Sequence, residues 1–63
     1  MQLTLKQARQ LTGFTQAEIA EKMGVATGTI HLWETGKVDI SAKKFCKFCE
    51  IAKVSRDDIL LPS

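Results

Sequence analysis

The sequence FTQAEIAEKMGVATGTIHLWETGK, residues 14–37, contains the strongest structural signals of the chain. Thr15 and Glu18 have the spacing of a capping box, in which a hydroxyl and a carboxylate satisfy free N–H groups at the start of a helix. Apolar residues follow at helical spacing as far as Gly24, a residue type that readily adopts the left-handed conformation found at helix ends. A further helix is expected over about residues 27–35, ending before Gly36.

Three residues, Gly24-Val25-Ala26, separate these two expected helices. Two short helices joined by a three-residue turn that contains glycine are the signature of a helix-turn-helix. Ala20 fits this interpretation, because it falls where the two helices cross and a small side chain lets their backbones approach. Val25 and Ile30 are expected to fill the wedge between the helices. The capping box, the turn and the apolar spacing together predict a helix-turn-helix.

The segments on either side also have helical patterns. Thr4 begins a predicted helix that ends before Gly13, Ser41 caps another that carries apolar residues as far as Ala52, and Ser55 caps a last short turn. Strand signals are missing, since no segment alternates for long enough and no Asn-Gly or Asp-Gly turn occurs. We therefore predict a compact all-α domain that spans residues 1–63.

Composition limits the classes of protein that this chain could represent. A chain of 63 residues has no room for a separate substrate domain, which argues against an enzyme. The formal net charge of +2 permits a polyanionic partner without requiring one. The apolar runs are far shorter than the ~20 residues of a bilayer span, and no signal peptide is recognisable. We expect a cytoplasmic protein whose two cysteines are thiols.

Residues 14–25 and 29–37 are similar to the phage repressor and Cro type of helix-turn-helix, the xenobiotic response element family, in which the ending Trp-Glu-x-Gly-Lys recurs. Residues 5–9 and 54–59 resemble small regulators from phages and prophages of Gram-positive bacteria. The resemblance implies a lambda-repressor-like domain of five helices whose third helix lies in the major groove of a DNA operator. It also implies homodimers in a bacterial host cell, with half-sites roughly 34 Å apart.

The same resemblance assigns roles to individual residues. Gly28 stands where the family often carries a base-reading side chain, and Ala26 stands at the usual Ser or Thr cap, so Thr27 would have to cap the third helix. The base-contact positions are then Thr27, Gly28, His31 and Leu32. The phosphate-contact candidates are Gln16, Thr29, Thr35, Lys37, Lys43 and Lys44. The competing interpretation of each of these polar side chains is an ordinary solvated surface.

Other chemistry-bearing residues favour structural roles. Arg9 and Glu34 resemble a structural ion pair of the family, which ties the first helix to the end of the third. Trp33 has the helical spacing of a core residue. Cys46 and Cys49 match a redox spacing but lack the strand-to-helix context of such a site, so packing is the better interpretation. No metal site and no cofactor are expected.

A second class of function is also open. The chain could keep this fold and act as a protein-interaction module that binds another phage regulator or repressor. Leu32, Ile40, Leu60 and Leu61 would then be contact residues. The candidate residues for a dimer or partner surface are Val38, Ile40, Ile59 and Leu60. Salt dependence separates the two functions, because phosphate contacts weaken steeply as salt rises and apolar contacts do not.

Overall fold

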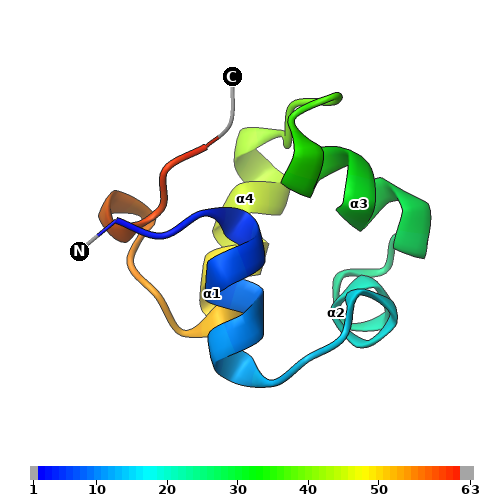
Figure 1. Ribbon diagram of the computed structural model, residues 1–63, viewed down its shortest axis with the longest axis horizontal. Coiled ribbons are helices and arrows are strands. Elements are labelled where there is room, and N and C mark those ends of the chain that lie inside the picture. Colours follow the sequence, from blue (N-terminus) through cyan, green and yellow to red (C-terminus); the bar gives the residue numbers. More distant parts are fainter. Residues whose placement is uncertain (1, 62–63) are drawn as a thin grey trace.

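A computed structural model describes residues 2–61, in which four α-helices are followed by a 3-10 turn (Figure 1). The elements are α1 (Leu5–Thr12), α2 (Gln16–Met23), α3 (Thr27–Thr35), α4 (Ala42–Ala52) and the turn η1 (Arg56–Asp58). The prediction of an all-α fold is confirmed, but the fifth helix that the family resemblance implies is only the short turn η1 in the described residues. Ser55 caps only a three-residue 3-10 turn, because Ile59 already has an extended backbone with φ −102° and ψ 127°.

Side chains cap three of the four described α-helices. Thr15 accepts a hydrogen bond from the Glu18 backbone at 3.1 Å, and Glu18 accepts one from the Thr15 backbone at 2.9 Å, which completes the predicted capping box. The bond from the Thr15 backbone lowers the pKa of the Glu18 carboxyl. A second capping box, formed by Thr4 and Gln7, begins α1, and Ser41 caps α4.

The start of α3 differs from the other helix starts. Ala26 is its N-cap residue and makes no side-chain hydrogen bond, while Thr27 already lies inside the helix. The expectation that Thr27 would cap α3 is therefore wrong. The physical reason is register: the extended backbone at Ala26, with ψ 150°, sets the first helical residue one position earlier than a Thr27 cap would need.

The turn between α2 and α3 follows the predicted pattern. Gly24 has φ 71°, the left-handed conformation, and its N–H donates to the last turn of α2. The Val25 N–H donates to the Ala20 carbonyl at 3.0 Å, which closes the helix end. Ala20 is buried between the helices, and Val25 packs against the core. The small side chain at Ala20 thus permits the close crossing that a helix-turn-helix needs.

The core lies where α1, α2, α3 and α4 meet. Ile30 and Trp33 are buried on the inner face of α3, which confirms the packing role predicted for the tryptophan. The remaining buried apolar residues of the described chain are Leu5, Ala8, Ile19, Ala20, Met23, Phe48, Cys49, Ala52 and Ile59. Burial of these residues from all four helices fixes the position of α3 relative to the rest of the protein.

An isolated parallel bridge between Leu3 and Ile59 joins the two ends of the described chain. Leu3 donates to the Asp58 carbonyl and accepts from the Leu60 N–H, both at 2.7 Å. Ile59, one of the predicted partner-contact residues, is only 8% exposed and therefore offers little surface to a partner. Pairing with Leu3 turns the Ile59 side chain into the core, a long-range effect that spacing alone does not reveal.

Lys53 ends α4 with φ 57°, and it is the one non-glycine residue with a positive φ in the described chain. The helices α1, α2 and α3 all use glycine at the corresponding position. A left-handed conformation is disfavoured for a residue with a Cβ atom, whereas glycine adopts it freely. The end of α4 therefore carries local strain that the other helix ends avoid.

The substitution Lys53→Gly should stabilise the protein. Relief of the left-handed strain exceeds the extra chain entropy of glycine, and we expect a gain of about 0.5–1 kcal/mol, or roughly 2–8 °C in Tm. Lys47→Gly, in the interior of the same helix, is the matched control and should cost about 1 kcal/mol. Thermal melts of the three proteins test the sign, and a lower Tm for Lys53→Gly would contradict the strain argument.

Candidate nucleic-acid interface

The outer face of α3 gathers the predicted base-contact residues on one surface. Thr27, Gly28, His31 and Leu32 are all exposed. Ile30 and Trp33 hold the opposite face in the core. The structure thus brings the four candidates together on one exposed face of a short helix whose orientation is fixed by buried side chains.

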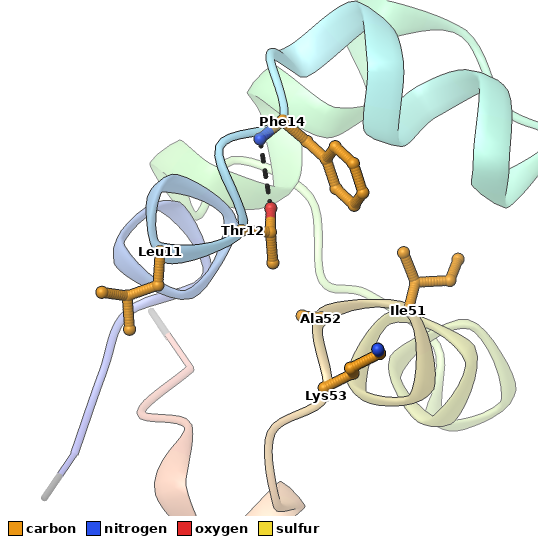
Figure 2. A pocket seen from close by; sticks show the side chains of 6 residues that line it. All are labelled: Leu11, Thr12, Phe14, Ile51, Ala52 and Lys53. Atoms are coloured by element: carbon orange, nitrogen blue, oxygen red, sulfur yellow. Dashed lines mark hydrogen bonds between the residues drawn. The ribbon is translucent and has the colours of Figure 1, made fainter.

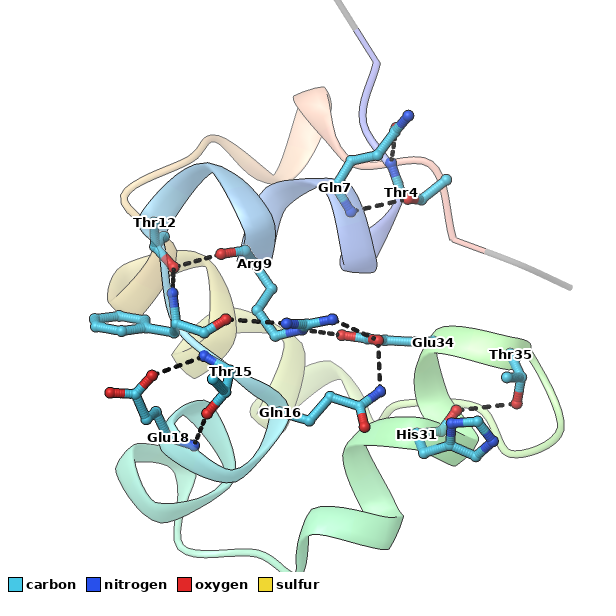
Figure 3. Close-up of polar contacts among 11 residues, drawn as sticks. Thr4, Gln7, Arg9, Thr12, Thr15, Gln16, Glu18, His31, Glu34 and Thr35 are labelled. Carbon is cyan, nitrogen blue, oxygen red and sulfur yellow. Dashed lines mark hydrogen bonds and ion pairs between the residues drawn. The ribbon is translucent and has the colours of Figure 1, made fainter.

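The phosphate-contact candidates differ in how exposed their side chains are and in whether these are already hydrogen-bonded within the protein. Lys37 follows the end of α3 and Lys43 lies in the first turn of α4, and both are exposed, whereas Lys44 and Thr29 are half-buried. The Thr35 hydroxyl donates to the His31 carbonyl at 3.0 Å (Figure 3). A phosphate contact from Thr35 would therefore require this internal bond to break.

Arg9 and Glu34 form a nearly buried ion pair. Arg9 Nε lies 2.6 Å from Glu34 Oε2, Arg9 Nη2 donates to Glu34 Oε1 at 3.3 Å, and the two side chains are 10% and 4% exposed. Arg9 Nη1 also donates to the Phe14 carbonyl at 2.9 Å (Figure 3). One guanidinium thus links α1, the loop before α2 and the last turn of α3. Such a fork-shaped contact fixes orientation as well as distance.

Gln16 is a third member of this network. Its Nε2 donates to Glu34 Oε1 at 2.9 Å, so the first residue of α2 is joined directly to α3 (Figure 3). A side-chain amide has two N–H donors, and this bond uses one of them. The sequence suggested a phosphate ligand or an ordinary exposed residue at Gln16 and did not reveal this contact, because no spacing rule relates the start of one helix to the end of the next.

A separate concavity lies at the ends of α1 and α4, away from α3. It has a volume of about 310 Å³ and is lined by Leu11, Thr12, Phe14, Ile51, Ala52 and Lys53 (Figure 2). Leu11 is 69% exposed, and the Lys22 ammonium lies 4.9 Å from the centre of the Phe14 ring. The Thr12 hydroxyl already accepts a hydrogen bond from the Phe14 backbone. This lining has no cluster of titratable groups that could support catalysis.

Of the predicted partner-contact residues other than Ile59, Val38 and Leu60 are 46% and 54% exposed, and Ile40 is half-buried. Leu11 is more exposed than either, yet it was not among the predicted surface residues. Its position three residues after the buried Ala8 resembles that of a core residue, but it lies in the last turn of α1 and is exposed.

The two cysteines have different environments. Cys46 is half-buried, whereas Cys49 is buried, and both are free. Burial raises the pKa of the Cys49 thiol, and the neighbouring Cys46 raises it further. Because the thiolate is the reactive form, Cys49 is a poor nucleophile and metal ligand. Among residues 2–61, no three His, Cys, Asp or Glu side chains are grouped as metal ligands would be.

The described part of the chain contains no helix that is both long and apolar enough to cross a bilayer.

Comparison with known proteins agrees with this geometry. The model of the Helix-turn-helix family matches residues 5–59. An uncharacterized HTH-type transcriptional regulator of Methanocaldococcus jannaschii is 38% identical over 61 residues, which cover 97% of this chain and 92% of that protein. No solved structure gives a significant match. The chain therefore belongs to the helix-turn-helix family, a family of regulators and not of enzymes, which confirms the prediction that it is not an enzyme.

Removing one partner of the buried ion pair should strongly destabilise the protein. In Glu34→Ala, Arg9 keeps its charge in a nearly dry site and Gln16 loses its acceptor, so we expect a loss of about 3–5 kcal/mol in the free energy of unfolding. Glu21→Ala, at an exposed position of α2, is the control and should change stability by less than about 0.5 kcal/mol. Urea or thermal unfolding measures both. Equal stability of the two variants would show that the pair contributes little.

Proposed function

We propose that this protein is a sequence-specific DNA-binding transcription regulator that inserts α3 into the major groove. The observation that carries the proposal is the exposed face formed by Thr27, Gly28, His31 and Leu32 on a helix that is anchored by buried residues. A rigid helix is suited to reading base edges, because direct readout requires side chains at fixed positions. In this arrangement Thr27 and His31 contact bases, and Leu32 meets a thymine methyl group.

Phosphate contacts position the helix on the duplex. Gln16 retains one amide N–H for a phosphate while its other N–H is bonded to Glu34, so the α2 contact and the orientation of α3 are coupled. Lys37, in the loop between α3 and α4, and Lys43, in the first turn of α4, supply exposed cations. Thr29, Thr35 and Lys44 complete the proposed set of phosphate contacts.

The proposed regulator acts as a homodimer, of the phage Cro and repressor kind, in the cytoplasm of a bacterial host, and residues 1–63 form its one domain. A two-fold operator would place the two copies of α3 one helical turn of DNA apart, roughly 34 Å. The exposed side chains of Val38 and Leu60 and the half-buried Ile40 are the proposed dimer contacts.

A protein-interaction module is the second candidate. The exposed neighbours Leu60 and Leu61 favour it, because adjacent apolar side chains at the surface can form part of a contact with a partner protein. Such a module would bind another regulator through apolar surface, and its affinity would depend only weakly on salt.

Titration of a labelled random-sequence duplex at about 50 and 200 mM salt separates the two candidates. With several phosphate contacts, DNA affinity should fall by about 100-fold or more between these concentrations. Lys37→Ala should reduce the slope of log K against log salt by about 1, whereas Lys6→Ala, at an exposed position of α1 outside the proposed interface, should leave it nearly unchanged. Failure to bind DNA even at low salt would overturn the proposed function and favour the interaction module.

A further inference from the structure

Gly28 lies in the first turn of α3, and nothing in the folded protein requires a glycine there. Its φ is not positive, in contrast to Gly13, Gly24 and Gly36, so the backbone does not need glycine's freedom. A Cβ atom built on Gly28 meets no heavy atom within 4 Å. Glycine in a helix is destabilising relative to alanine, because more chain entropy is lost on folding. Glycine at position 28 therefore lowers the stability of the isolated protein relative to alanine, and no contact within the fold explains its presence.

This loss of stability affects a helix that also lacks a capping side chain. Its N-cap residue, Ala26, provides no side-chain hydrogen bond, whereas the caps of α1, α2 and α4 each do. An alanine at position 28 would strengthen the helix and would clash with nothing in the protein. The reason for glycine is therefore better sought in something that binds to this exposed face.

The neighbouring side chains indicate what that requirement is. Thr27 lies beside Gly28 on the exposed face, and its hydroxyl is only one bond beyond Cβ. Such a short side chain can reach a base edge only if the helix backbone itself comes close to the bases. At that depth, a side chain on the adjacent position 28 would occupy space needed by the DNA. The short base-contacting side chain of Thr27 and the absence of a side chain at Gly28 are thus both consistent with a close approach of the α3 backbone to the bases.

Building on the proposed function, we propose that Gly28 is a clearance position at which the backbone of α3 comes into van der Waals contact with the floor of the major groove. Gly28 then determines specificity by allowing deep insertion, in which Thr27 reaches a base. A longer residue at position 28 would hold the helix away from the base pairs while leaving the more distant phosphate contacts of Lys37 and Lys43 largely intact.

The test uses Gly28→Ala and Gly28→Leu, since both residues are good helix formers. Both variants should melt above the parent protein, by about 4 °C for alanine. A duplex enriched from a randomised library with the parent protein should bind Gly28→Ala at least 10-fold more weakly, and Gly28→Leu more weakly still. A random-sequence duplex, bound mainly through phosphates, should lose less than about 3-fold. Lys53→Gly, at the far end of α4, controls for stabilisation by itself and should bind the enriched duplex like the parent.

A higher Tm together with weaker binding of the enriched duplex in the Gly28 variants would support the clearance role. Tight binding of the enriched duplex by Gly28→Ala, equal to that of the parent, would overturn this inference and leave the proposed function standing. Equal losses on enriched and random duplexes would also overturn it, because they would indicate a general effect on the surface. A library that yields no enriched sequence would overturn sequence-specific binding, and the clearance role with it.

Discussion

The contact between the Arg9 guanidinium and the Glu34 carboxylate is the polar constraint on the position of α3, and it acts together with the apolar core. Local sequence supports α3 poorly, since it lacks a capping side chain and carries Gly28 in its first turn. Its place is set instead by tertiary contacts: Ile30 and Trp33 in the core, and Glu34 at the hub of three donated hydrogen bonds. Because Arg9 and Gln16 donate to the same carboxylate, α1, α2 and α3 are joined at a single point. The exposed face of α3 is therefore held in place by these tertiary contacts rather than by the helical propensity of its own sequence.

The sequence was most informative where structure is determined locally. The Thr15–Glu18 capping box, the left-handed Gly24 and the bounds of the third helix at residues 27–35 follow from spacing rules, and the structure has all of them. Family resemblance added the pairing of Arg9 with Glu34, whose atoms lie within hydrogen-bond distance. These features depend on a few neighbouring residues or on a recurrent motif, and one sequence is enough to recognise them.

Features that depend on contacts between distant segments were missed. Ile59 is buried where it pairs with Leu3, a residue far away in the sequence. The bond from Gln16 to Glu34 depends on the crossing of two helices, which spacing predicts only in outline. For the candidate site, the sequence identified residues that share one exposed face of α3, but it could not show that Thr35 is bonded internally or that Gln16 belongs to the ion-pair network.

The bridge between Leu3 and Ile59 also has a consequence for the order in which the fold opens. Its two hydrogen bonds close a loop that contains almost the whole described chain, whereas the contacts between α2 and α3 join near neighbours in sequence. Contacts that close long loops form late, because the chain entropy must be lost before they return any free energy. The ends should therefore separate in excursions that leave the helix-turn-helix folded. Amide hydrogens of Leu3 and Leu60 would then exchange with solvent through these partial openings, faster than those in the middle of α2.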